Sequence, residues 1–249
     1  MRRNRLFLLV IFIGLSFSGY SQEDTTLVKE RKNIIRWNLT PMAVIGPKSL
    51  VLGYQRVLKG GKSFSVNVGY LELKPFKKKD GTVIKVFDHT NKGGFDLAAD
   101  FRFYFKKRNK YPAPDGLYWG PFAAWYNFNY EGSSDIVDNG IANTIGIESN
   151  INMYSVGVQL GYQFIIKKRF SVDLILLGPS YTHYDFNMKF NSVIALDPNS
   201  DFYQEFKDVL STLLPGSEVI LDGVDFSTGG RARLNYFGFR YGVQIGYVF

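Results

Sequence analysis

The sequence predicts an all-β fold, an eight-stranded antiparallel transmembrane β-barrel with one short helix in the last extracellular loop. The first observation is a period of two beyond Asn33: over residues 95–105, apolar odd positions alternate with aspartate, arginine and other residues at even positions. Such alternation makes one strand face apolar and the other small or polar. The second observation is length. Runs of eleven or more residues fit a tilted strand that crosses a membrane, which needs about 9–11 residues, whereas strands of soluble sandwiches usually have about five or six.

Eight such segments follow one another along the chain. We expect strands near residues 34–42, 49–57, 63–73, 94–105, 117–130, 151–165, 169–186 and 231–249. The connections alternate between short turns, at 59–62, 106–116 and 166–168, and loops that are longer on average, at 43–48, 74–93, 131–150 and 187–230. This arrangement is typical of a transmembrane barrel, and closure is required because an open sheet edge in hydrocarbon leaves amides unpaired.

The last long loop contains the clearest helical pattern, over residues 201–214. Asp201 and Gln204 can form a capping box, and Pro215 with Gly216 ends the helix. The apolar residues at helical spacing are Phe202, Phe206, Val209, Leu210, Leu213 and Leu214. This helix could cover the barrel mouth, lie in the outer-leaflet interface or bind a partner.

The N-terminal residues have the features of a secretory signal peptide. Three arginines among the first five residues precede an apolar run from Leu6 to Leu15, and small residues stand before Gln22. The run is shorter than the roughly 20 residues that a spanning helix needs, although an N-terminal anchor is an alternative. The absence of cysteine excludes a lipid anchor, disulfides and thiolate metal sites. We expect a signal peptide at 1–21, a periplasmic segment at 22–33 and the barrel at 34–249.

Six charged residues point into the barrel lumen by strand parity. This lumen polar network consists of Arg36, Asp96, Asp100, Arg102, Asp173 and Arg240. Buried charges are costly unless they are paired, and an eight-stranded barrel is just wide enough for its side chains to fill it. We therefore expect a salt-bridged plug without an open pore, with a proton or small-ion path as the alternative. Inward glycines could make room for long side chains or leave a partial cavity.

The last strand carries a pattern that suits strand addition to an assembly machine's exposed edge. Its apolar residues at alternate positions are Tyr241, Val243, Ile245, Tyr247 and Phe249. This pattern resembles the assembly signal of bacterial outer-membrane proteins, and the topology resembles the small OmpX and OmpA-type barrels. Segments 37–39 and 116–122, together with the glutamine after the expected cleavage site, are similar to Bacteroidetes outer-membrane barrels of unknown function. The resemblance implies the fold and an outer-membrane location, and it transfers no functional residue.

Basic residues gather in the short turns of a chain whose formal net charge is +8. They are Lys59, Lys62, Lys106, Lys107, Arg108, Lys110, Lys167, Lys168 and Arg169. Contact with anionic phospholipid headgroups explains them simply, and nucleic acid is an implausible partner for an exported barrel. Lysines at 74 and 77–79 in a long loop could bind lipopolysaccharide phosphates or be solvated.

The enzyme hypothesis rests on two histidines, His89 in a long loop and His183 near the outer end of the seventh strand. A serine–histidine pair must meet within about 3 Å. Strand parity predicts that His183 and Asp185 point inward and Ser180 points outward, which separates the pair. We therefore expect no catalysis, and we expect no cofactor and no metal site.

The sequence thus predicts a monomeric protein of the bacterial outer membrane, with a structural or surface-interaction role carried by long extracellular loops. Its expected partners are outer-membrane lipids, lipopolysaccharide, the barrel-assembly machinery and a surface partner bound by the loops. The alternatives are a lipid-modifying acyltransferase or deacylase at the outer rim, and a narrow channel or small-molecule binder.

Overall fold

The computed structural model describes residues 31–72, 85–138, 141–191 and 230–249. Residues Lys32–Phe249 form one compact unit. The expected signal peptide, most of the expected periplasmic segment and the expected helix at 201–214 lie outside the described residues. The elements are β1 (Asn33–Asn38), α2 (Thr40–Val44), β2 (Leu50–Leu58), β3 (Lys62–Leu71), β4 (Lys85–Tyr104), β5 (Gly116–Asp138), β6 (Ile141–Ile166), β7 (Phe170–Asn191) and β8 (Gly230–Val248).

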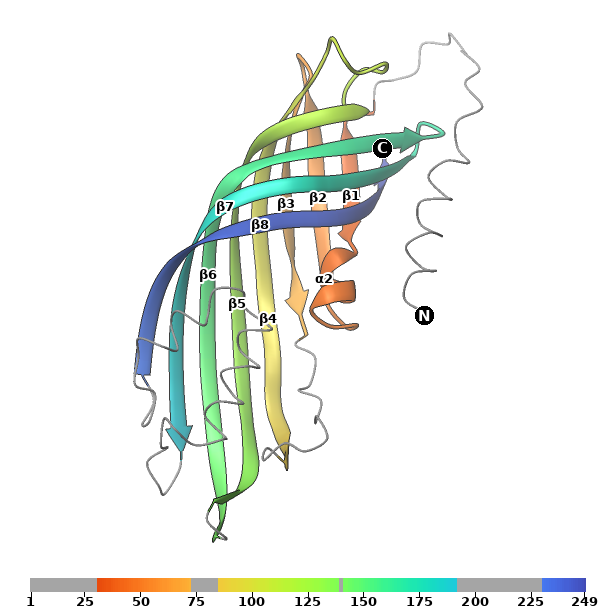
Figure 1. Cartoon of the computed structure of the whole chain (residues 1–249). Helices are drawn as coiled ribbons and strands as arrows, with labels where there is room; N and C mark the ends of the chain where they lie inside the picture. The colour runs from red at the N-terminus through yellow and green to blue at the C-terminus, as the bar shows by residue number, and fades with distance from the viewer. Residues whose placement is uncertain (1–30, 73–84, 139–140, 192–229) are drawn as a thin grey trace, which may run out of the picture. The chain divides into compact units, whose positions relative to one another are not determined.

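The eight strands form a closed barrel in sequence order, and every neighbouring pair is antiparallel (Figure 1). The barrel closes between β1 and β8, where Ile34 pairs with Val248 and Asn38 with Gln244. This arrangement confirms the predicted fold class. In the described part of the chain, no helix is long and apolar enough to cross a membrane.

The strands around β5 are longer than the sequence predicted, and β4 to β7 reach farther than β1 to β3 (Figure 1). The segment 131–150, which we expected to be a long loop, is mostly a hairpin in which β5 runs to Asp138 and β6 starts at Ile141. The prediction was wrong there because strand recognition relied on apolar alternation. Beyond the membrane the outward side chains are polar, so a strand no longer shows that pattern.

The first strand is shorter than predicted, because β1 ends at Asn38 and α2 follows it. Pro41 has no backbone N–H to donate to a ladder, and it suits the first turn of a helix, where it lies. The Thr40 hydroxyl accepts a hydrogen bond from the Val243 N–H at 2.8 Å. The Leu39 N–H still donates to the Val243 carbonyl at 2.9 Å, so a side chain supplies only the second hydrogen bond of this residue pair at the end of the β1–β8 seam.

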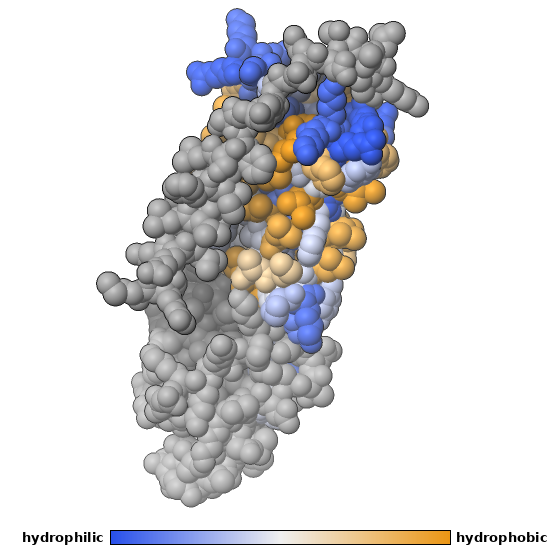
Figure 2. Space-filling model, turned by 90° about the vertical axis from the view of Figure 1, so that its right-hand side faces the viewer, coloured by the Kyte–Doolittle hydropathy of each residue, from blue (hydrophilic) through white to orange (hydrophobic). Residues whose placement is uncertain are grey.

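Apolar side chains cover the outer surface of the strands. The exposed apolar residues of β2, β3, β6 and β8 include Leu52, Tyr54, Val66, Val68, Val156, Val158, Val243 and Ile245. Figure 2 shows hydrophobic side chains between hydrophilic groups on one face of the barrel. An exposed apolar surface of this extent is unfavourable in water and suits the hydrocarbon of a membrane. The short turns lie at the barrel end that also holds Asn33 and Phe249, which is the periplasmic end in this class of fold.

Candidate functional site

Buried ion pairs connect opposite sides of the barrel wall. The Asp173 carboxylate on β7 accepts a hydrogen bond from Arg36 of β1 at 3.1 Å and forms an ion pair with Arg102 of β4 at 2.8 Å. Arg102 also pairs with Asp100 at 2.6 Å, and all four side chains are fully buried. Two positive and two negative groups thus neutralise one another in the interior, as an ion cluster removed from water requires.

Uncharged side chains complete this cluster. The Tyr118 hydroxyl donates to Asp173 at 2.7 Å, and the Ser65 hydroxyl donates to Asp100 at 2.6 Å. The Arg102 guanidinium lies 4.4 Å from the centroid of the Tyr118 ring. A second group of buried hydrogen-bonded side chains adjoins it: Gln55, Ser63, Tyr104, Gln163 and Ser171. The interior on this side is therefore filled by mutually bonded side chains.

The other two residues of the predicted network lie apart from this cluster. Asp96 is buried, and Arg240 lies over the Phe122 ring at 4.9 Å. Among the described residues, Asp96 Oδ1 and Arg240 Nη1 are buried without a hydrogen-bond partner, as are both amide atoms of Gln159 and Gln244. The structure thus brings together four of the six predicted charges and leaves Asp96 and Arg240 outside their ion pairs.

Glycines allow the long interior side chains to approach the wall. A Cβ at Gly161 would lie 2.4 Å from the Tyr118 hydroxyl oxygen, and a Cβ at Gly53 would lie 2.1 Å from Asn67 Oδ1. Real side chains do not approach so closely, and at Gly161 the Leu174 carbonyl oxygen would also lie only 2.7 Å away, so this position requires glycine. At Gly161 the glycine makes room for a long side chain, that of Tyr118, which was one of the two uses expected from the sequence.

A β-bulge in β7 reverses the parity that the sequence predicted for the outer half of this strand. Ile175 pairs with Gly242 and Gly178 pairs with Arg240, so β7 has one extra residue. Leu176 and Leu177 both face outward, with 54% and 50% of their surface exposed. A bulge places two successive residues opposite one, and every later side chain changes face. The alternation alone could not reveal this extra residue.

The predicted orientations of Ser180, His183 and Asp185 were therefore wrong. Ser180 and Thr182 are buried, and their hydroxyls approach to 3.3 Å. His183 instead faces outward, where its ring stacks near Tyr154 and its Nδ1 lies 2.8 Å from Asn235 Oδ1. Asp185 stays on the face of His183, as predicted, but bonds to Arg231 at 2.8 Å. Ser180 and His183 still lie on opposite faces of the strand. The side chain of His89 lies outside the described residues.

The outward face of β5, β6 and β7 changes character toward the extracellular end. Trp125, Tyr154 and His183 form an aromatic row across the three strands, since each pairs with the next. Aromatic residues of this kind mark the membrane–water interface in barrels. The next rows are Asn127–Asn152–Asp185, Asn129–Asn150–Asn187 and Glu131–Glu148–Lys189. The membrane-facing surface thus ends at the aromatic row, and a polar surface begins two residues beyond it.

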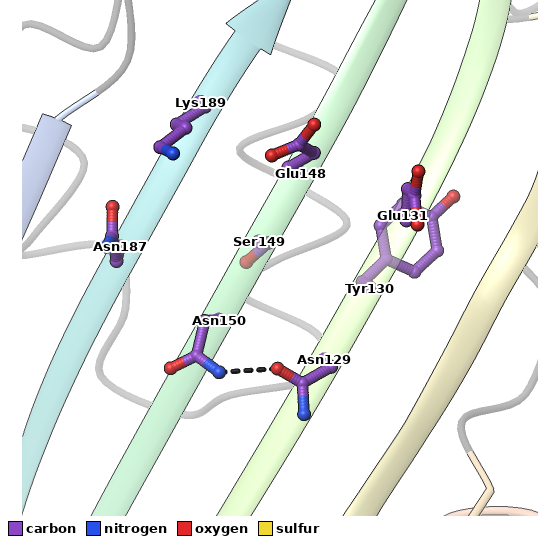
Figure 3. A pocket seen from close by; sticks show the side chains of 8 residues that line it. All are labelled: Asn129, Tyr130, Glu131, Glu148, Ser149, Asn150, Asn187 and Lys189. Atoms are coloured by element: carbon purple, nitrogen blue, oxygen red, sulfur yellow. Dashed lines mark hydrogen bonds between the residues drawn. The ribbon is translucent and has the colours of Figure 1, made fainter.

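A groove of about 440 Å³ lies on this polar surface (Figure 3). Its lining residues are Asn129, Tyr130, Glu131, Glu148, Ser149, Asn150, Asn187 and Lys189. The sequence did not reveal this groove, because six of its eight lining residues lie in the segments 131–150 and 187–230, which we expected to be loops. The available signal was the repeated asparagine at every second position, at 127 and 129 and again at 150 and 152.

Two carboxyl groups outside the membrane-spanning part have shifted pKa values. Burial in the periplasmic turn raises the pKa of Asp115, although the Ile165 N–H donates to it at 3.3 Å and acts in the opposite direction. The hydrogen bond from Arg231 holds the pKa of Asp185 below its usual range. Ionisation of Asp115 and ionisation of Asp185 therefore change the stability of the fold in opposite directions.

The residues of the expected assembly signal all face outward, four on β8 and Phe249 directly after it. Tyr241, Val243, Ile245, Tyr247 and Phe249 are exposed. The Phe249 main chain bonds to that of Asn33 through an N–H donated at 2.8 Å and a carbonyl accepting at 3.1 Å. Their role in assembly stays a prediction.

In the ranges that the structure describes, no three His, Cys, Asp or Glu side chains form a group that could hold a metal ion.

A closed antiparallel barrel with an apolar exterior and a charged, hydrogen-bonded interior defines a β-barrel protein of the bacterial outer membrane. The chain belongs to the family described as "Protein of unknown function (DUF3575)", and the match covers residues 10–196. Among solved structures, the chain is similar to a major outer membrane protein from Thermus thermophilus. That similarity has 11% identity and a TM-score of 0.36, and it covers 88% of this chain and 98% of that chain. No curated protein matches the chain.

Proposed function

We propose that this outer-membrane barrel has a closed lumen and serves as a structural or surface-interaction protein that acts through its extracellular end. The observation that carries the proposal is the buried cluster of Arg36, Arg102, Asp100 and Asp173. It joins β1, β4 and β7 across an interior that is narrow in any eight-stranded barrel. Opening a pore would separate these buried charges from their partners of opposite sign, which is strongly unfavourable.

The proposed partners follow from the two ends of the barrel. Exposed lysines and arginines of the short turns, among them Lys107 and Arg108, suit anionic phospholipid headgroups at the periplasmic side. Lipopolysaccharide and a surface partner are proposed at the extracellular end, and the barrel-assembly machinery is proposed for β8. The resemblance to Bacteroidetes barrels and to OmpX and OmpA-type barrels belongs to this proposal, as does a monomeric state.

We do not propose a lipid-modifying activity, because Ser180 and the rim histidine His183 lie on opposite faces of β7.

A narrow channel or binder of small polar species is the second candidate. It is favoured by the polar atoms of Asp96, Gln159, Arg240 and Gln244 that lack a partner among the described residues, since buried polar groups usually have one.

Planar-bilayer recording tests the closed lumen. We expect no stable single-channel steps from the folded wild-type protein. A triple variant with Arg36→Ser, Arg102→Ser and Asp173→Ser removes the centre of the buried cluster, and it should conduct if it assembles. This variant shows that the assay can detect a pore in this barrel. Stable single-channel currents from the wild-type protein would overturn the proposal and favour the second candidate.

A further inference from the structure

Four asparagine side chains form a closed ring of hydrogen bonds on the outward face of β5 and β6. Asn127 donates to Asn152 at 2.9 Å, and Asn152 donates to Asn150 at 2.8 Å. Asn150 in turn donates to Asn129, which donates back to Asn127 at 2.7 Å. Each amide therefore gives one N–H to the ring and receives one. We call these four residues the asparagine ring.

Trp125 fixes the direction of this ring. Its indole N–H donates to Asn152 Oδ1 at 3.1 Å, and an indole nitrogen can only donate. Asn152 must therefore turn its oxygen toward Trp125 and its NH₂ toward Asn150. The donor-to-acceptor direction of the other three hydrogen bonds in the ring follows from this orientation. The side-chain amides are thus oriented before any ligand arrives, which lowers the entropy cost of binding.

The asparagine ring leaves hydrogen-bonding capacity on both kinds of atom. A side-chain amide has two N–H donors and an oxygen that accepts twice. The ring uses one N–H of each residue and one acceptor site of each, and the Trp125 bond uses a second site on Asn152. Every ring residue keeps a donor, and Asn127, Asn129 and Asn150 also keep an acceptor. The surface can therefore bind groups that donate and accept at once.

The groove begins at this ring and continues toward the extracellular end. Asn129 and Asn150 belong to both the ring and the groove lining, and Asn187 extends their row onto β7 (Figure 3). In the next row, Glu131 and Glu148 pair directly across the two strands, and Lys189 pairs with Glu148. Two carboxylates at neighbouring positions accept hydrogen bonds from hydroxyl groups well, and they favour the uncharged sugars of a headgroup over its phosphates.

We propose that this groove binds a saccharide, and specifically the carbohydrate headgroup of a glycolipid in the outer leaflet. Sugar hydroxyls donate and accept together, as the asparagine ring and its carboxylate neighbours require. The aromatic row of Trp125, Tyr154 and His183 lies two residues from the ring and marks the interface. A ligand in the groove therefore lies at the level of the headgroups. This inference rests on the proposed surface-interaction role and gives its glycolipid partner a binding site.

Binding of lipopolysaccharide and of its released core oligosaccharide tests the proposal. The wild-type protein in phosphatidylethanolamine nanodiscs should bind the oligosaccharide in calorimetry, and should retain lipopolysaccharide when the nanodiscs include it. The double variant Asn129→Ala with Asn150→Ala should weaken both by about tenfold, because it removes two oriented amides. Asn235→Ala on β8 is the matched control, since Asn235 is exposed at the same end but does not line the groove. It should bind as the wild type does.

A milder variant covers the case in which the double variant does not fold. Trp125→Phe keeps an aromatic ring but removes the N–H that orients Asn152, and should weaken binding by about threefold. Equal binding by the wild-type protein and the variants, or no binding by any of them, would overturn the proposal. Binding of the free oligosaccharide without retention of lipopolysaccharide would overturn the glycolipid assignment. Neither result bears on the closed lumen, which the conductance experiment tests separately.

Discussion

Arg102 and Asp173 form an ion pair of 2.8 Å across the interior of the barrel, although β4 and β7 are separated by two strands. The same Asp173 oxygen also holds Arg36 at 3.1 Å. One carboxylate therefore links three strands that are not neighbours in the wall. Its removal leaves two buried guanidinium groups to share the single carboxylate of Asp100.

We expect Asp173→Ala to lower the free energy of unfolding by about 3–5 kcal/mol, the usual cost of leaving a buried charge without its partner. Denaturant unfolding of the protein in detergent micelles measures this change. The control is Asp185→Ala, which breaks an exposed pair with Arg231 and should cost less than about 1 kcal/mol. Equal effects of the two substitutions would show that the interior cluster does not stabilise the barrel.

The bulge at Leu176 and Leu177 gives a second prediction. Deletion of Leu176 removes the extra residue, so that β7 alternates regularly after Ile175 while Ser180 and Thr182 still face the interior. We expect this deletion to retain the heat-modifiable folded form on gels. Deletion of Thr182, in the regular part of the strand beyond the bulge, turns His183 inward and Tyr184 outward and should abolish that form. Loss of the folded form in the Leu176 deletion as well would mean that the bulge itself is required for folding.

Sequence alternation predicts the membrane-spanning strands of this barrel well, because lipid on one side and a polar interior on the other impose a period of two. It places Arg36, Asp100, Arg102 and Asp173 in the interior, since none of them follows the bulge in β7. It fails at Ser180 and His183, because one extra residue in β7 moves every later side chain to the other face, and nothing in the pattern of residue types marks that extra residue. Pairing across strands also cannot be read from a single strand, so the partners of Asp173 were not predictable.

The asparagine ring shows a different limit. Asn127 and Asn129 on β5 meet Asn150 and Asn152 on β6 only because the hairpin pairs in that register. With segment 131–150 taken as a loop, nothing brought these residues together. An uninterrupted hairpin would have been suggested by placing the turn at the Asn139-Gly140 dipeptide, which favours a tight turn between strands. The structural details of residues 139–140 lie outside the described part of the chain.

The stability of the periplasmic turn should depend on pH through Asp115. Burial raises the pKa of this carboxyl in the folded protein, so the folded state holds the proton more tightly than the unfolded state. Its stability is therefore greatest below the ordinary aspartate pKa and falls as the pH rises through the raised value. Asp115→Asn has no proton to lose, so it should be more stable than the wild type at pH 7, and the two should converge in acid.

Denaturant midpoints measured over a pH series check this sign. Asp185→Asn is the useful comparison, because the pKa of Asp185 is lowered by its bond to Arg231. This substitution should lower stability at neutral pH, and its effect should vanish as the pH falls through the folded-state pKa. A loss of stability in Asp115→Asn at pH 7 would mean that the bond from the Ile165 N–H outweighs burial.

Phe249 gives the last prediction, which separates assembly from stability. Its main chain bonds to Asn33 beside the β1–β8 seam, while its side chain faces outward with 46% of its surface exposed. A side chain in this position adds little to the folded barrel, so a role in edge pairing with an assembly machine would appear only during insertion. We expect Phe249→Ala to reduce the amount of barrel in the outer membrane while the protein that does fold unfolds at the wild-type denaturant concentration. Phe239→Ala is the matched control, since Phe239 is an outward phenylalanine on β8, the strand that precedes Phe249, with 70% exposure. If both substitutions reduce the membrane yield equally, outward aromatic surface in general supports assembly, and Phe249 has no special part in it.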